Sequence, residues 1–491
     1  MAGNIKDRLK VDQEILGVVS GGVFGALFLV LGLGALFGGR YGYGGDAVAS
    51  MGFIAILGLM VCGAGLLYAL FHPRFGLPSV ALGTLIGLGI FVHFAGLGVK
   101  DDWTAPPDRP SDIRAIGSWS TGDLVVRARP DKVVAYRATT GDTAWSWTPP
   151  AEDSVCAMSR ETGHGIGLFA HGAHGRPCAT AIALDLATGT PRWTANLDAP
   201  LRAGDTAVPG LLAVAGDRAV LQETGGWRAV SLTDGSAAWR SAVDPDCAPL
   251  RVAGGPDTAV TVAQCTKGGP VLRTLAPQDG QERTHTVLPL ANGLNDAAVL
   301  SADPLTVWVD EQGDRGTHAV LAFDRAGKVR STIPVSGDEY DLDVTLGGAH
   351  ALQRFEARPA YGAVVVGDLL VVPGEKPDDV TFGGAKHNSR HAAGRLVAYS
   401  LADGGKRWTA GLDDQVTGLA VDGTRVWAMT RNSLTGVDTA TGHEDESLAV
   451  LGTESDDPSD LAPDGPGRFT VVARDGTTDA EPPVRAVAVP R

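Results

Sequence analysis

The 491-residue sequence has few basic residues for its length, and this shortage argues against a nucleic-acid partner. Residues 101–491 hold 35 of the 41 Lys and Arg residues and 52 of the 56 Asp and Glu residues, which gives a formal charge of −17. Such a surface repels phosphate backbones and lacks the electrostatic attraction that dominates nucleic-acid binding. We therefore expect no nucleic acid among the partners.

The sequence also lacks the short motifs of several enzyme classes. It contains no Walker loop, no nucleophile elbow and no H-E-x-x-H motif. Its five cysteines form no C-x-x-C pair, so the spacing of a zinc site is missing. Four of them form two local pairs, Cys156 with Cys178 and Cys247 with Cys265. Because the count of cysteines after residue 100 is even and each spacing suits neighbouring strands, we predict two disulfides formed in an oxidising compartment.

Long apolar runs occur only near the N-terminus. Three runs without a charged residue, at about 15–38, 51–71 and 78–98, are each long enough to cross a hydrocarbon core of roughly 30 Å as a helix. Four basic residues precede the first run or lie between the second and third, against two on the other side. This distribution predicts a cytoplasmic segment at 1–14 and places everything after the third run outside the cytoplasm.

Glycine is abundant, with 66 residues, and it marks a repeat. A polar, proline-rich stretch at 100–112 is predicted to be a linker. After it one pattern recurs, which consists of a strand, a turn with glycine, and a tryptophan four residues past that glycine. The turn glycines follow at steps of 48, 46, 45, 47, 77 and 38 residues, and the longest step holds a polar insertion at 375–394. Copies at 272–284, 321–330 and 434–444 lack the tryptophan. The principal motif residues are Gly141, Trp145, Asp185, Gly189, Trp193, Gly235, Trp239, Gly404, Trp408, Asp438 and Gly442.

A period in the forties with strands on both sides of each glycine predicts an all-β propeller over 113–491. Glycine is expected to take the turn at positive φ, and tryptophan to fill the space between blades. The last strand, at 484–491, looks like an eighth copy, and we expect it to pair with 113–120 and close the ring. The prediction is eight four-stranded blades, with seven as the alternative.

The pattern A-x-D-x-x-T-G-x-x-x-W, seen best from Ala183 to Trp193, resembles the repeat of the pyrroloquinoline-quinone-binding-like propeller superfamily. That superfamily includes quinoprotein alcohol and glucose dehydrogenases and the scaffold lipoproteins of outer-membrane assembly. The resemblance implies a quinoprotein-dehydrogenase-like fold. In an enzyme the resemblance would also imply pyrroloquinoline quinone (PQQ) with a calcium ion held by Glu, Asn and Asp, but no residue here matches those positions. Many alcohol dehydrogenases of the superfamily also have a disulfide between adjacent cysteines over the cofactor, and no two cysteines are adjacent here.

Histidines and acidic residues offer metal-site candidates. His164, His171 and His174 lie in one glycine-rich stretch, and His387 and His391 lie in the insertion. Neutral imidazoles bind transition metals, although a solvated hairpin and loop would have the same composition. An acidic run could bind calcium through its oxygens, but it lacks the glycine and terminal glutamate of an EF-hand. It consists of Asp338, Glu339, Asp341 and Asp343.

Two functions remain open from the sequence. The first is a non-catalytic binding, scaffold or sensor module, anchored in the cell membrane by three helices, without a cofactor, and with an extracytoplasmic protein or small ligand as partner. Loops on a rigid ring usually carry recognition, so the insertion at 375–394 is the leading candidate surface. The alternative is a PQQ-dependent dehydrogenase that oxidises an alcohol or a sugar.

Overall fold

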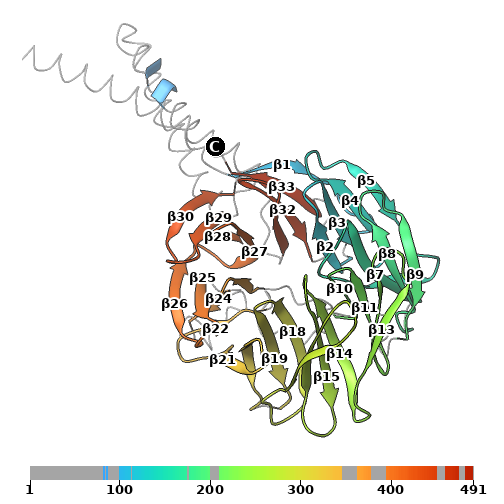
Figure 1. The fold of residues 1–491 in the computed structure, drawn as a ribbon. Helices are drawn as coiled ribbons and strands as arrows, with labels where there is room; N and C mark the ends of the chain where they lie inside the picture. Colours follow the sequence, from blue (N-terminus) through green and yellow to red (C-terminus); the bar gives the residue numbers. More distant parts are fainter. Residues whose placement is uncertain are drawn as a thin grey trace, which may run out of the picture. The chain divides into compact units, whose positions relative to one another are not determined.

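The structure is an eight-bladed β-propeller (Figure 1). It is a computed structural model that describes residues 81–82, 84–86, 99–111, 113–173, 176–198, 210–313, 315–344, 362–376, 394–450, 459–474 and 482–489. Within these residues, 33 strands form eight sheets, seven of four strands and one of five. The prediction of eight blades is confirmed, and the alternative of seven is wrong.

Blades 1 to 4 are regular sheets in which consecutive strands pair from the centre of the ring outward. Blade 1 contains β2 (Gly117–Ser120), β3 (Leu124–Ala128), β4 (Val133–Arg137) and β5 (Thr143–Trp147). Blade 2 contains β6 (Asp153–Met158), β7 (Ile166–Ala173), β8 (Thr180–Asp185) and β9 (Pro191–Asn196). Blade 3 contains β10 (Leu212–Ala215), β11 (Arg218–Glu223), β12 (Gly226–Ser231) and β13 (Ala237–Ala242). Blade 4 contains β14 (Cys247–Gly254), β15 (Ala259–Cys265), β16 (Val271–Leu275) and β17 (Glu282–Val287).

Blades 5 to 8 include two irregular sheets. Blade 5 contains β18 (Leu294–Ala302), β19 (Leu305–Glu311), β20 (His318–Phe323) and β21 (Val329–Pro334). In blade 6, β22 (Asp341–Leu342) and β23 (Val364–Val366) share the inner edge of β24 (Leu369–Glu375), followed by β25 (Arg395–Ser400) and β26 (Lys406–Gly411). Blade 7 contains β27 (Val416–Asp422), β28 (Arg425–Thr430), β29 (Ser433–Asp438) and β30 (Glu444–Ala449). Blade 8 contains β31 (Ser459–Pro463), β32 (Arg468–Ala473), β33 (Val484–Ala488) and β1 (Lys100–Thr104).

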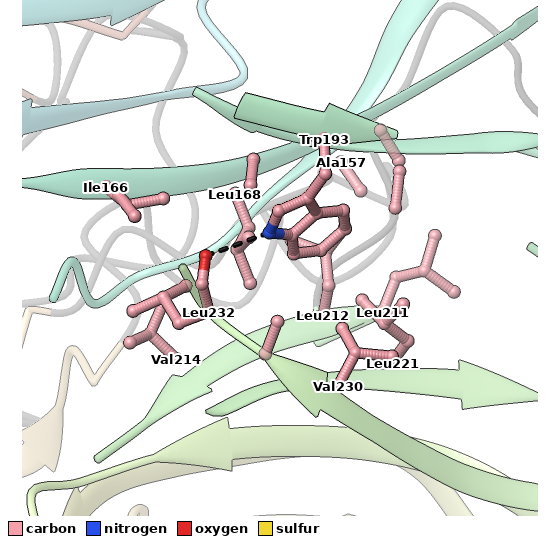
Figure 2. Close-up of a cluster of buried hydrophobic side chains, with 14 of the residues drawn as sticks. Ala157, Ile166, Leu168, Trp193, Leu211, Leu212, Val214, Leu221, Val230 and Leu232 are labelled. Carbon is pink, nitrogen blue, oxygen red and sulfur yellow. Dashed lines mark hydrogen bonds between the residues drawn. The ribbon is translucent and has the colours of Figure 1, made fainter. Parts of the chain in front are cut away.

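The burial of each strand follows its distance from the centre of the ring. All five residues of the middle strand β3 are buried, because neighbouring blades cover both faces of its sheet. The outer strands β13 and β17 instead alternate between exposed and half-buried positions. Figure 2 shows one core layer, in which Leu168 of blade 2 faces Val214 and Leu221 of blade 3. The apolar runs of the repeat thus form a core between blades.

An N-terminal strand closes the ring. β1 pairs with β33 as the outermost strand of blade 8. The stretch 100–112, predicted to be a linker, therefore begins with a strand of the propeller. The expectation that 113–120 pairs with the last strand is wrong, since Gly117–Ser120 form the inner strand of blade 1. An outer strand exposes most of its side chains, so the sequence KDDWT has the polar character of a linker.

Tryptophans on outer strands dock on the turn glycine of the next blade. Trp193 packs on Gly235, whose φ is +73°, and its indole Nε1 donates a hydrogen bond to the Leu232 carbonyl at 2.8 Å (Figure 2). In the described chain the same arrangement occurs in four more pairs: Trp103 with Gly141, Trp145 with Gly189, Trp239 with Gly280 and Trp408 with Gly442. Trp103 lies in β1, so the closing strand brings its own docking residue.

Blade 7 shows why one copy of the repeat has no tryptophan. Glu446 stands four residues after Gly442, the position that Trp145, Trp193, Trp239 and Trp408 occupy in their copies. The next blade has no turn between its third and fourth strands, because β1 comes from the other end of the chain. An indole at Glu446 would therefore have no turn glycine to pack on.

The predicted membrane helices fall almost wholly outside the described residues. Of the run at 78–98, only 81–82 and 84–86 are described, and they are helical. The runs at 15–38 and 51–71 are not described. In the described part of the chain, no helix has both the length and the apolar character needed to cross a membrane.

We predict that Gly442→Ala destabilises the protein more than Gly423→Ala. Both glycines have positive φ, +71° and +60°, so alanine costs about 1–2 kcal/mol of backbone strain at either position. Only at Gly442 would the new methyl carbon meet an indole, 2.6 Å from Trp408 Cδ2, whereas nothing lies within 4 Å at Gly423. The overlap adds about 1–3 kcal/mol, measurable by denaturant unfolding. An equal decrease in the free energy of unfolding in the two variants would contradict the docking of Trp408 on Gly442.

Candidate binding face

The antiparallel blades give the ring two different faces. One face, which we call the turn face, carries the glycine turns between the third and fourth strands of each blade and the connections between the first and second strands. The crossover face carries the connections between second and third strands and those from one blade to the next. The connection from β24 to β25, which contains the insertion, belongs to the crossover face. Residues 377–393 of that insertion lie outside the described residues.

Both predicted disulfides are confirmed, and both lie toward the crossover face. Cys247 begins β14 and Cys265 ends β15, and the two residues are directly opposite each other with a Cα–Cα distance of 3.9 Å. Cys156 in β6 is bonded to Cys178, two residues before β8, with a Cα–Cα distance of 6.2 Å. Each disulfide lies close to the loops of the crossover face, at strand ends or within a connection. It therefore limits the movement of the residues from which those loops begin.

The structure separates two members of the predicted histidine cluster. His164 is exposed in the turn before β7, whereas His171 is buried near the other end of that strand. From Ile166, where β7 begins, to His171 the strand advances roughly 17 Å. The His171 Nδ1 atom lies 2.7 Å from Asp153 Oδ2, and its ring packs beside Trp147. His174, His387 and His391 lie outside the described residues.

The acidic run begins in the turn between β21 and β22 with Asp338 and Glu339, continues into β22 with Asp341 and ends after that strand with Asp343. Asp338 and Glu339 are exposed, and Glu339 forms an ion pair with Lys406, while Tyr340 points into the core. Among the residues that the structure describes, no three His, Cys, Asp or Glu side chains are grouped to hold a metal ion.

A buried charge cluster, which the sequence did not reveal, joins blade 8 to blade 1 at the crossover face. Arg127 and Arg129, 2% and 1% exposed, both pair with Asp108, and Arg129 also makes two 2.8 Å hydrogen bonds to Asp131. Arg127 Nε donates to the Ala473 carbonyl of blade 8 at 3.1 Å. Burial lowers the pKa of Arg127, although Asp108 opposes that shift. Asp108 lies in the stretch predicted to be a linker, so no sequence signal marked it.

A second polar cluster holds the crossover loops of blade 5. The two carboxylate oxygens of Glu311 accept hydrogen bonds from the backbone N–H groups of Asn292, at 2.5 Å, and Thr317, at 2.7 Å. Burial alone would raise the pKa of Glu311, but these hydrogen bonds hold it below its usual value. Burial raises the pKa of the neighbouring Asp310, against the opposing effect of His318, whose Nδ1 lies 2.5 Å from the Asp310 carboxylate.

The aspartates of the repeat motif cap the glycine turns on the turn face. Asp438 accepts hydrogen bonds from the hydroxyl and the backbone N–H of Thr441, and these bonds lower its pKa. Asp185 binds Thr188 in the same way and also pairs with Arg192. These bonds lower the pKa of Asp185, although its burial opposes the shift. Both carboxylates thus have a structural role in their turns.

One protein-family model matches part of the chain. It is described as outer membrane protein assembly factor BamB and matches residues 159–336, which include most of blade 2 and all of blades 3 to 5. This is a little over a third of the sequence. No curated protein matches the chain.

Several solved structures resemble the chain at low identity. BamB from Moraxella catarrhalis is 15% identical, with a TM-score of 0.45 and coverage of 79% of this chain and 97% of that one. Sqt1 from Saccharomyces cerevisiae is 12% identical, with a TM-score of 0.45 and coverage of 80% and 100%. The C-terminal WD40 domain of Sif2 is 8% identical, with a TM-score of 0.46 and coverage of 80% and 99%. The number of blades does not depend on these similarities, because the eight sheets of this chain give it directly.

We predict that Glu311→Gln lowers stability at neutral pH and has little effect in acid. A glutamate whose pKa is lowered by folding stabilises the protein above its unfolded pKa, and that contribution is lost as the pH falls through the folded value. Replacing one buried acceptor by an amide costs about 1–3 kcal/mol at pH 7. Denaturant unfolding at several pH values measures the difference. If Glu311→Gln lowers the free energy of unfolding by the same amount at pH 7 and below the folded pKa of Glu311, the stabilising role of the Glu311 charge is contradicted.

Proposed function

We propose that this chain is a membrane-anchored, extracytoplasmic scaffold that binds a protein partner through the crossover face. The observation that carries the proposal is the way the ring is closed. The predicted third membrane helix ends at Gly98, and β1 begins two residues later, at Lys100. Because β1 is part of blade 8, a membrane anchor would be joined directly to a strand of the ring and not through a flexible linker.

The crossover face is suited to recognition because its loops leave fixed positions. The disulfides and the clusters around Asp108 and Glu311 hold the ends of strands there. Loops on a rigid scaffold commonly carry binding residues. The insertion at 375–394, with its ends on this face, remains the leading candidate contact. The matching family of outer-membrane assembly factors supports a scaffold role.

The alternative, PQQ-dependent oxidation, has support only from the resemblance of the repeat. The buried carboxylates described above accept hydrogen bonds from loops or form pairs with Arg and His side chains. They act as structural anchors in the ring. The scaffold proposal therefore uses no cofactor.

Two variants of the full chain, each with one added cysteine and compared with the wild type, test both the face and the compartment. Lys267 lies on the crossover face with its side chain 80% exposed, and Asp403 lies on the turn face with its side chain 58% exposed. We expect Lys267→Cys and Asp403→Cys both to react, on intact cells, with a thiol reagent that cannot cross the cytoplasmic membrane. With a bifunctional form of that reagent, we expect only Lys267→Cys to give a discrete protein adduct.

Two outcomes would contradict the proposal. Labelling that requires cell lysis would place the propeller inside the cytoplasm. Stoichiometric binding of PQQ with calcium by the purified full chain, with reduction of an electron-accepting dye in the presence of an alcohol or sugar, would favour the dehydrogenase. Adducts formed equally from both variants would overturn the choice of face alone.

A further inference from the structure

Blade 5 lacks the docked tryptophan at the glycine turns on both of its sides, although Trp308 of β19 is buried in the core that it shares with blade 6. At the turn of Gly327, blade 4 provides Thr284 and Thr286, and the Thr286 hydroxyl donates to the Gly327 carbonyl at 2.6 Å. Toward blade 6, Ser331 stands four residues after Gly327, in the tryptophan position, and its hydroxyl donates to the Leu401 carbonyl at 2.8 Å. The hydrogen bond is retained, but the 150–250 Å² that an aromatic side chain typically buries is lost.

Polar contacts take the place of the indoles around blade 5. Arg251 of blade 4 pairs with Asp296 of β18 at 2.5 Å. Arg330 of β21 forms two hydrogen bonds, 3.1 and 3.0 Å, with Asp368 of blade 6. Both pairs remain partly exposed, and solvent-exposed ion pairs contribute little to stability. Apolar clusters join blade 5 to both neighbours, as they do blade 2, but at the glycine turns blade 5 is held more weakly than blade 2, which has Trp145 on one side and Trp193 on the other.

An arginine from blade 2 reaches across the ring to the inner strand of blade 5. Arg160 follows β6, and its Nη1 donates to the carbonyls of Val299, at 3.2 Å, and Leu300, at 2.9 Å. Blades 3 and 4 separate these two blades along the ring. The pairing of β18 with β19 shifts between Val299 and Ser301, so Leu300 forms no ladder pair. This bulge leaves a backbone acceptor for the arginine.

We propose that blade 5 is the part of the ring that opens locally, and that Arg160 is the latch that keeps it closed. Local opening is favoured where fewer buried apolar contacts must be broken, and blade 5 has no docked indole at the turns on either side. Release of the latch frees β18 and withdraws the arginine side chain from the centre of the ring. The inference concerns the mechanics of the ring and does not depend on the proposed scaffold function.

Hydrogen–deuterium exchange on the purified full-length chain tests both parts. In the wild type we expect amides of β19 and β20 to exchange on the order of tenfold faster than those of β7 and β8, the corresponding strands of blade 2. Arg160→Gln should accelerate exchange in β18 to β20 by a similar factor and leave blade 3 unchanged. Ser331→Trp, which adds the missing indole, should slow exchange in blade 5.

The matched control is Arg192→Gln, because Arg192 is another arginine of blade 2 whose hydrogen bonds stay with Asp185 in its own blade. It should leave exchange in blade 5 unchanged. Equal protection of blades 2 and 5 in the wild type would overturn the opening of blade 5. An effect of Arg160→Gln that is absent, or uniform around the ring, would overturn the latch. If Ser331→Trp does not fold, Thr284→Trp on the other side of blade 5 serves the same purpose.

Discussion

The contact between a tryptophan of one blade and the turn glycine of the next is the interaction on which this propeller depends. The glycine adopts positive φ and has no side chain, so the indole can lie directly on the backbone of the turn. The indole N–H then bonds a carbonyl of the same turn, which sets its orientation. Where it occurs, between five pairs of described blades, this contact helps to place one blade against the next. On both sides of blade 5, where it is missing, hydroxyl groups and ion pairs provide weaker substitutes.

Much of the fold could be predicted from the sequence, because the repeat places local signals at a regular period. Gly189 and Trp193 follow a strand in a pattern that recurs, and the two cysteine pairs are each close in sequence. The closing strand was missed although Trp103 stands 42 residues before Trp145, because no turn glycine precedes Trp103 by four residues and its neighbours are polar. The cluster of Asp108 with Arg127 was missed because it forms only when blade 8 meets blade 1. Likewise, no sequence pattern connects Arg160 with Leu300, which are 140 residues apart.

The candidate binding face was harder to predict than the fold. Histidines close in sequence suggested a site, but a strand separates His164 from His171, and the latter pairs with Asp153. The buried polar groups instead hold loop bases, as Glu311 does between two connections of blade 5. Such anchoring supports the proposal of a face for recognition on a rigid ring. It also distinguishes the crossover face from the turn face, where Asp185 and Asp438 complete the glycine turns.

The most direct test of this account compares two tryptophans in the full-length chain. Trp193 docks on Gly235 inside the repeat, whereas Trp103 docks on Gly141 from the N-terminal closing strand. Both indoles are 9% exposed, and truncation of a buried tryptophan to alanine typically costs about 3–5 kcal/mol. If docking from β1 closes the ring, Trp103→Ala and Trp193→Ala lower the unfolding temperature by similar amounts. A Trp103→Ala variant as stable as the wild type would contradict the account.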